Sequence, residues 1–432
     1  MSEQTPPRRA GARRPEQSRR APHGWPHALV AVLASLAAMA VVAGLGLWAA
    51  GAADLPGGAF PSVVAAVVVM AVGGSVGLSG DAGMIAETDA GLSVLPLSVS
   101  LVGALVLAAG FLRPLRHRAV ADVRELAGWA ARIAVLWVVL LIGLALLARH
   151  RFAIALGDGP VGEIGDLLDS SPEVGFKTDV PLTLVFGLLW LAGVLVVALL
   201  VSRGAPLPAR LLRFQESVRP AAFAMVFLLL SYAALGLVAG LVVAATRGHA
   251  AQTCAVLLLG LPNLVWLAFT LGLGASWEGR VDGPFGLPMP RVLDEVLRTP
   301  ADSTLSLRTL AEYDGRVWWL LVVAALLVVA AAFLMAARSP ARMRAWQHAA
   351  HMAVALALTV LAVCLLAGVS AHYGLSLLGI GDLGGGLSGL VELRPHLWQA
   401  LLLAVTWGLV SGFLGGVLAR RVHRRGEVRP GA

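Results

Sequence analysis

The chain alternates between long apolar runs and short polar connectors. About 20 apolar residues span the ~30 Å hydrocarbon core of a bilayer when they form a helix that rises ~1.5 Å per residue. A membrane β-barrel would instead show alternating segments of ~10 residues. The pattern therefore predicts an all-α integral membrane protein with about ten membrane-embedded helices. The ten segments are 28–50, 60–78, 92–112, 125–147, 180–201, 221–246, 253–274, 316–337, 350–370 and 397–419.

The order of segments and connectors occurs twice along the chain. Each half has a helix, a Gly-interrupted apolar segment, a polar loop and a helix that ends in basic residues, RPLRHR in the first half and ARSPARMR in the second. A further helix, a long Gly/Asp loop and a final helix follow in both halves. We therefore predict two tandem membrane repeats, 27–204 and 221–425, arranged around an axis normal to the membrane. A shared bias toward Gly, Leu and Ala could also produce this similarity.

The distribution of basic residues bears on topology, because Lys and Arg are enriched in cytoplasmic connectors. If all ten segments cross, the connectors and tails place 18 basic residues inside and 14 outside. If one segment per half is re-entrant and does not cross, the division becomes 22 to 10. The bias favours eight crossings with both termini in the cytoplasm of a bacterial plasma membrane.

The second segment of each half is the best candidate for the re-entrant one. The first-half segment runs into MAVGGSVGLSG, and the second-half segment is broken by LGLPN at 259–263. Gly and Pro leave backbone groups unpaired, which a membrane protein tolerates only inside protein or beside a wet cavity. Paired interruptions at matching positions of two halves also indicate a transporter site. Ordinary tilted, Gly-rich helices remain the alternative.

Composition limits the class of protein further. Hydrophobic residues make up 58% of the chain and charged residues only 13%, against about 25% charged in soluble domains. The net charge of +8 comes from arginines at segment ends, which cytoplasmic retention and anionic headgroups explain better than nucleic acid does. Cys254 and Cys364 both lie in apolar runs and form no metal-binding pattern. We expect no cofactor and no metal.

The polar ends and the link between the halves complete the predicted domain organisation. Residues 1–26 are rich in Arg and Pro and predict a disordered cytoplasmic tail. The uncharged run that follows is too long for a cleavable signal peptide, so we expect a retained first helix. Residues 205–220 form a cytoplasmic linker in this scheme, and 426–432 form a second cytoplasmic tail.

The run VGLSGDAGMIAETDAGLSVLPLSVSLVGALVLAAGFLRPLRHR resembles the streptophobe family of actinobacterial membrane proteins, and PFGLPMPRVLDEVLR is similar to that family too. The resemblance covers nearly the whole chain in length and segment order. It implies an integral membrane location and a Streptomyces-like source. The family has no established activity, so the resemblance assigns no catalytic or binding residue.

Three carboxylates, Asp81, Glu87 and Asp89, form the sharpest polar cluster. Flanked by glycines at the mouth of the first broken segment, they could bind a hard cation or attract a cationic solute. Their spacing matches no calcium loop, and Asp and Gly also make ordinary turns, so a solvated loop is the simpler interpretation.

Two further polar residues lie within apolar segments. Asn263, beside Pro262, could hydrogen-bond a solute or a neighbouring helix. Tyr232, in the preceding segment, could line the same space. Together with the carboxylates they make a speculative solute or ion path. Yet no Asp or Glu lies in the middle of any segment, and coupled carriers usually need one.

Other features point to packing. Gly408, Gly412 and Gly416 form a stripe on the last segment, and Gly236 and Gly240 repeat the spacing, which predicts close helix approach. Many tryptophans fall near segment ends, as in an interfacial belt. The loop stretch PRVLDEVLR predicts a short amphipathic surface helix.

These patterns support three hypotheses. The first is a permease- or channel-like protein with a site between two repeats. The second is a non-transporting envelope assembly or scaffold protein that acts through its outer loops and its helix packing. An enzyme acting on lipids is least supported, because no acid/base pair faces a helix interior and no nucleotide-binding or hydrolase motif occurs. The expected partners are the bilayer and a membrane protein or second copy, and no nucleic acid.

Overall fold

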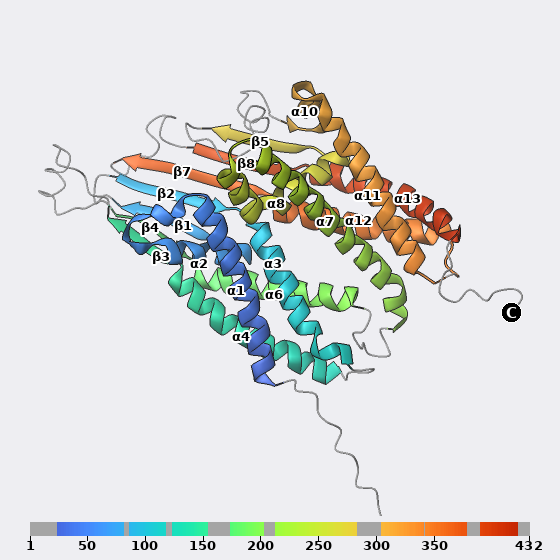
Figure 1. Cartoon of the computed structure of the whole chain (residues 1–432), viewed down its shortest axis with the longest axis horizontal. Helices are drawn as coiled ribbons and strands as arrows, with labels where there is room; N and C mark the ends of the chain where they lie inside the picture. The colour runs from blue at the N-terminus through green and yellow to red at the C-terminus, as the bar shows by residue number, and fades with distance from the viewer. Residues whose placement is uncertain are drawn as a thin grey trace, which may run out of the picture.

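The computed structural model describes residues 24–81, 86–117, 123–153, 173–202, 212–282, 304–340, 342–377 and 389–421. Apolar helices dominate these residues (Figure 1). The helices are α1 (Trp25–Ala49), α2 (Phe60–Ala71), α3 (Leu97–Leu112), α4 (Val123–Leu147), α6 (Val180–Val201), α7 (Leu212–Thr246), α8 (Ala250–Gly272), α10 (Leu307–Tyr313), α11 (Trp319–Arg338), α12 (Ala345–Ala367) and α13 (Leu397–Leu418). Short 3-10 turns are η1 (Ala52–Asp54), η2 (Pro56–Gly58), η3 (Pro114–His117), η5 (Gly315–Trp318) and η6 (Ala419–Arg421).

A helix stands at each of the ten predicted apolar segments. Among the described residues, eight helices are long and apolar enough to cross a membrane, namely α1, α4, α6, α7, α8, α11, α12 and α13. The apolar helices α2 and α3 are shorter. The prediction of a polytopic helical membrane protein is confirmed. Helix α7 begins at Leu212, so part of the segment expected as a linker is helical.

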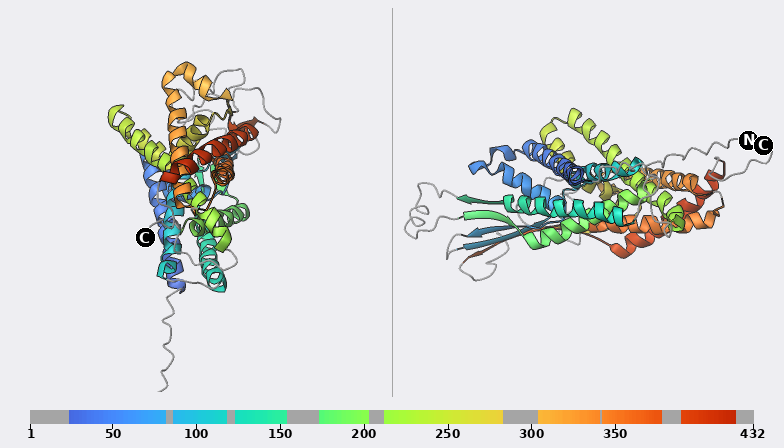
Figure 2. Two further views of the ribbon diagram at one scale, coloured as in Figure 1. Left: turned by 90° about the vertical axis from the view of Figure 1, so that its right-hand side faces the viewer. Right: turned by 90° about the horizontal axis from the view of Figure 1, so that it is seen from below.

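A sheet accompanies the helices, and the all-α prediction omitted it. Its strands are β1 (Val76–Asp81), β2 (Ala86–Ser93), β3 (Arg149–Ala153), β4 (Glu173–Thr178), β5 (Trp277–Asp282), β6 (Thr304–Leu305), β7 (Val369–Leu377) and β8 (Gly389–Pro395). They form one eight-stranded sheet in the order β3-β4-β1-β2-β7-β8-β5-β6, with every neighbouring pair antiparallel. The strands extend beyond the helices at one end of the molecule (Figure 2).

Both halves of the chain contribute to this sheet. Strands β1 to β4 come from the first half and β5 to β8 from the second. The joint between them is the β2–β7 pair, in which Ala86–Ser93 lies opposite Ser370–Leu377 without a break. The loop predicted at Gly80–Gly91 is therefore largely strand, because its backbone finds hydrogen-bonding partners about 280 residues away (Ala90 with Tyr373, for example), which local pattern could not indicate.

The strand order also bears on how the halves are related. The four first-half strands lie in the order β3-β4-β1-β2, and the second-half strands continue as β7-β8-β5-β6. The observed order repeats in one direction, so the two sets of strands follow one another sideways across the sheet. The predicted arrangement of two repeats around an axis normal to the membrane stays a prediction.

The second helix of each half ends in the same way. After α2, Gly73 has a φ of 95° and Gly74 donates to the carbonyl of Val69 at 3.0 Å. After α8, Gly274 has a φ of 95° and Ala275 donates to the carbonyl of Thr270 at 3.0 Å. Only glycine adopts this left-handed cap without strain. Both caps turn the chain directly into a strand, β1 or β5.

Each half has its own apolar core, and the cores interlock at one place. One cluster is built from α7 to α13 but includes Leu97 from the start of α3. The other is built from α1 to α6 and has Leu259, from α8, packed against it. Helix α8 therefore joins the halves inside the membrane, as the β2–β7 pair joins them outside the helices.

The predicted glycine stripe packs within the chain. A Cβ on Gly412 would lie 2.7 Å from the Cα of Ala349, and one on Gly416 would lie 3.2 Å from the Cα of Ala345. The same side of α13 meets Ala353 at Gly408. Small residues on both helices thus let α12 and α13 approach closely. The predicted close approach is confirmed.

The tryptophans divide into two groups. Six that were expected at the interface are more than half exposed: Trp25, Trp48, Trp318, Trp319, Trp346 and Trp398. Trp129 and Trp277 are fully buried. Their indole N–H groups donate to the Phe111 carbonyl and to the Thr270 hydroxyl. The interfacial belt therefore describes only part of the set, because a buried indole that finds an acceptor is stable inside protein.

Candidate functional site

Asn263 lies at the crossing of α3 and α8, where polar side chains of each helix bond the backbone of the other. Its side-chain carbonyl accepts from the backbone N–H of Leu97 at 3.1 Å, and its amide donates to the Leu95 carbonyl at 2.9 Å. The first N–H groups of a helix have no partner within the helix. Asn263 therefore caps α3 from another helix, and both ends of its amide are used in doing so.

Ser98 makes the reciprocal contact from α3 to α8. Its hydroxyl donates to the Leu257 carbonyl at 2.8 Å and accepts from the Leu261 N–H at 3.0 Å. These two backbone groups are i and i+4 within α8, so the hydroxyl joins a donor and an acceptor that lie one helical turn apart. Helix α8 runs unbroken from Ala250 to Gly272 with Pro262 inside it, so the break predicted at LGLPN does not interrupt the helix. The Ser98 hydroxyl instead bonds the α8 backbone beside the proline, which has no N–H of its own.

Tyr232 lies in α7, which packs against α8 through Gly236 and Gly240. Its ring packs against Phe269 with the centroids 4.9 Å apart, and the residue is only 5% exposed. The hydroxyl has no hydrogen-bond partner in the structure. Nearby, the Trp266 indole donates to the Leu229 carbonyl of α7 at 3.2 Å. The surroundings of Tyr232 are apolar, and its one polar atom is enclosed among them.

The three carboxylates lie elsewhere, in the sheet. Asp81 ends β1 opposite Glu87 of β2 and Glu173 of β4, while Asp89 lies opposite Ser79 and Gly374. Asp81, Glu87 and Glu173 thus share one row of the sheet at the register level. The structure brings Asn263 and Tyr232 onto neighbouring helices, but it places the three carboxylates on β1 and β2 of the sheet. Whether the five residues form a solute or ion path stays a prediction.

A second polar contact, which the sequence analysis missed, fixes α6 against α3. The Trp190 indole donates to the Ser100 hydroxyl at 2.8 Å, and Trp190 stacks on Trp137 with the centroids 5.1 Å apart. Trp137 in turn donates to the Gly187 carbonyl at 3.1 Å. Ser98 and Ser100 both lie in the run LPLSVS, so two serines close behind a proline were the available signal.

The chemistry of these contacts is structural. Each described hydroxyl or amide in the two helix crossings bonds a backbone group or a single side chain of a neighbouring helix. Within the part of the chain that the structure describes, no three His, Cys, Asp or Glu residues gather as metal ligands would. The amphipathic stretch PRVLDEVLR lies outside the described residues. No protein-family model, curated protein or solved structure matches this chain.

Proposed function

We propose that this protein is a non-transporting scaffold of the bacterial plasma membrane, which displays an eight-stranded sheet on the outer face. The observation that carries the proposal is the β2–β7 joint, which makes one sheet out of hairpins from both halves. A transporter whose halves move against each other would have to break the β2–β7 pairing or move both strands together with the helices. A scaffold gains from it, because the joint fixes the relative position of all four hairpins.

The ends of the helices support the proposed orientation. Strands follow or precede the ends of α2, α3, α4, α6, α8, α12 and α13. The Arg-rich connectors adjoin the opposite ends, as at Arg113 after α3 and Arg344 before α12. Because basic connectors remain in the cytoplasm, we assign the sheet to the outside and both termini to the inside.

This arrangement assigns eight crossings. Helix α1 leaves the basic side, so α2 begins on the sheet side, and its glycine cap returns the chain to β1 on that same side. Helix α8 likewise begins on the sheet side in this scheme, and its glycine cap returns the chain to β5 on that same side. We therefore assign α2 and α8 as the segments that do not traverse. The 16-residue α3, extended by η3, takes the eighth crossing instead of the longer α8.

Matched geometry also supports two repeats. Pro61 precedes Gly73 by the same number of residues as Pro262 precedes Gly274, and β1 and β5 start and end at the same offset from these glycines. Helix α2 corresponds in this alignment to the part of α8 that begins at Leu261. The proposed resemblance to the streptophobe family would extend this architecture to other actinobacterial membrane proteins.

One observation favours the permease- or channel-like alternative. Pro262 inside α8 has its counterpart in the first half at Pro61, in the first turn of α2. Paired broken segments are the best sequence pointer to a transport site. Against this, both polar ends of the Asn263 amide are already bonded to the α3 backbone.

Two measurements on the full chain separate these functions. Reconstituted into vesicles, the protein should leave proton leak and osmotic swelling in a panel of small solutes at the level of empty vesicles. In cells, a photo-crosslinker at the exposed Arg394 of β8 should form a discrete protein adduct, while one at the lipid-facing Leu409 of α13 should not. Solute flux that disappears in Asn263→Ala would reject the scaffold in favour of the permease.

A further inference from the structure

Three helix ends meet at the side of the molecule away from the sheet. A Cβ on Gly416 of α13 would lie 3.2 Å from the Cα of Ala345, the first residue of α12. A Cβ on Gly415 would lie 2.6 Å from the carbonyl carbon of Ala332 in α11. Directly after α13, Ala419 of η6 is fully buried. The residues that flank these contacts are therefore held next to one another.

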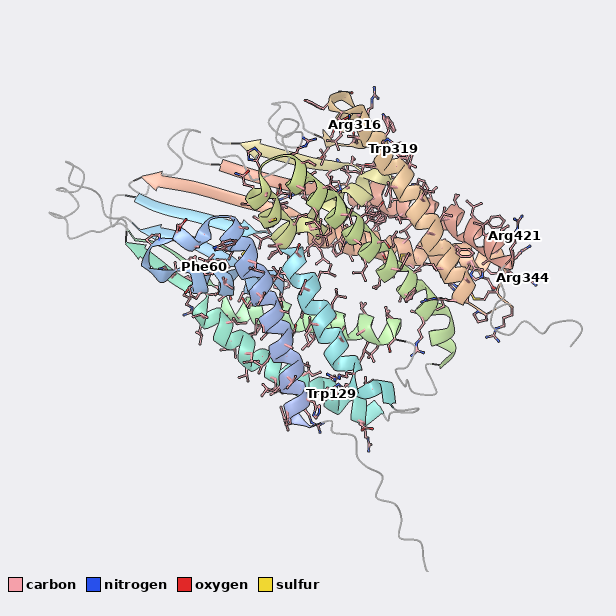
Figure 3. All side chains as sticks on the ribbon, viewed as in Figure 1. Phe60, Trp129, Arg316, Trp319, Arg344 and Arg421 are labelled. Carbon is pink, nitrogen blue, oxygen red and sulfur yellow. The ribbon has the colours of Figure 1, made fainter. Side chains whose placement is uncertain are left out.

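These ends carry five arginines: Arg338, Arg342, Arg344, Arg420 and Arg421. Figure 3 shows Arg344 and Arg421 at neighbouring places on this end of the molecule. Arg338 is used inside the protein, since its guanidinium carbon lies 3.4 Å from the centroid of the Phe223 ring in α7. Arg344, Arg420 and Arg421 are exposed. We call these three the basic corner.

The helices that form the basic corner bring no negative charge to it. From Gly315 to Gly381 and from Pro395 to Arg421 the sequence has no Asp or Glu. The corresponding end of the first half differs, because Arg124 at the start of α4 is followed directly by Glu125. The basic corner therefore has a local excess of positive charge, to which α11, α12 and α13 add no carboxylate.

The basic corner lies at the edge of the hydrocarbon layer. Trp346, two residues after Arg344, is 61% exposed, and tryptophan marks the membrane–water boundary. Exposed apolar side chains continue along both helices from this point, with Val354 and Leu358 on α12 and Phe413 and Val417 on α13. A ligand here can place an anionic group beside the guanidinium groups and apolar chains along the helices.

We propose that the basic corner binds the headgroup of an anionic phospholipid, with the acyl chains against the exposed faces of α12 and α13. Guanidinium groups match phosphate oxygens in a bidentate geometry. A soluble phosphate would meet the same charge but none of the apolar surface. The inference depends on neither the scaffold function nor the assignment of the cytoplasmic side, since it uses only charge and the hydrocarbon boundary.

The test compares lipid binding to the purified full chain by native mass spectrometry, with phosphatidylglycerol and phosphatidylcholine as probes. Each arginine near an anionic lipid contributes about a fivefold change in affinity (~1 kcal/mol). The triple variant R344Q/R420Q/R421Q should therefore bind phosphatidylglycerol roughly a hundredfold more weakly. Its affinity for phosphatidylcholine should not change.

Two control variants separate a site from general charge. R344K/R420K/R421K retains the charge and should keep most of the affinity. R113Q/R124Q neutralises arginines at the corresponding end of the first half and should change the affinity for phosphatidylglycerol little. The proposal fails if the triple glutamine variant, folded by size-exclusion chromatography, binds phosphatidylglycerol as wild type does. It also fails if phosphatidylcholine binds equally well, or if millimolar inorganic phosphate displaces the lipid.

Discussion

At the scale of single residues, two polar side chains within the apolar helices bond one helix to another. Asn263 and Ser98 satisfy four backbone groups across the crossing of α3 and α8. In a bilayer no water replaces a lost partner, although measured interhelical hydrogen bonds average only about 0.6 kcal/mol. This crossing is where the two apolar cores interlock, so its bonds couple the halves.

Removing either side chain should lower the stability of the whole chain. For Asn263→Ala and for Ser98→Ala we expect a loss of about 1–2 kcal/mol in the free energy of unfolding, because backbone groups lose their partners. Thermal unfolding in detergent would measure it. Thr359→Ala is the matched control, since that hydroxyl bonds only the Ala355 carbonyl of its own helix. Equal, small effects in all three variants would show that the crossing does not couple the halves.

Tyr232 gives the opposite expectation. Its enclosed hydroxyl has no hydrogen-bond partner in the structure, so Tyr232→Phe removes an unsatisfied polar atom and keeps the ring against Phe269. The free energy of unfolding should stay the same or rise by up to ~1 kcal/mol. Trp266→Phe, which loses the bond to the Leu229 carbonyl, should lower it. A clear loss in Tyr232→Phe would mean that the hydroxyl serves a bound solute or water, as the permease hypothesis requires.

At the scale of elements, helix packing depends on where a side chain would meet backbone. A Cβ on Gly412 would meet the Cα of Ala349 and the carbonyl oxygen of His348, both at 2.7 Å. These atoms cannot move aside as a flexible side chain can. Gly193 of α6 has nothing within 4 Å of its Cβ position.

Alanine at these two glycines should therefore have opposite effects. Gly412→Ala forces α12 and α13 apart and should cost about 1–3 kcal/mol of unfolding free energy. Gly193→Ala should be neutral or slightly stabilising, since alanine favours the helix. Melting temperatures in the same detergent give the comparison. Similar melting temperatures for the two variants would contradict the close α12–α13 contact.

The elements differ in how far the sequence could predict them. The ten helices were predictable because an uncharged run of about 20 residues has few stable alternatives in a membrane. The sheet was not, because β2 is AETDAGLS, whose Ala, Asp and Gly are poor strand formers. Its pairing partner, β7, lies in the other half of the chain. Similarly, Asn263 was recognisable as a polar residue in an apolar run, but its partner at the start of α3 was not.

At the scale of the whole molecule, the two halves share a sheet on one side and a helix crossing within the membrane. The β2–β7 register can be tested by oxidation of cysteine pairs in a chain lacking Cys254 and Cys364. Ala90→Cys with Tyr373→Cys places paired residues opposite each other, where Cα atoms lie about 4.5–5.5 Å apart and a disulfide can form.

The control shifts one cysteine by one position. Ala90→Cys with Gly374→Cys puts the two Cβ atoms on opposite faces of the sheet, so this pair should remain reduced. The disulfide changes the migration of the chain after proteolysis between the halves, which gives the readout. Equal oxidation of both pairs, or of neither, would contradict the register of the joint.

The proposed scaffold function requires that strands from both halves face the outside while the Arg-rich ends face the cytoplasm. Labelling of single cysteines in intact cells by a membrane-impermeant maleimide tests it directly. We expect Gly77→Cys in β1 and Glu278→Cys in β5 to be labelled, and Arg344→Cys and Arg420→Cys to be labelled only after the cells are permeabilised. Labelling of Gly77→Cys together with Arg344→Cys in intact cells, or of only one of the two strand positions, would contradict it.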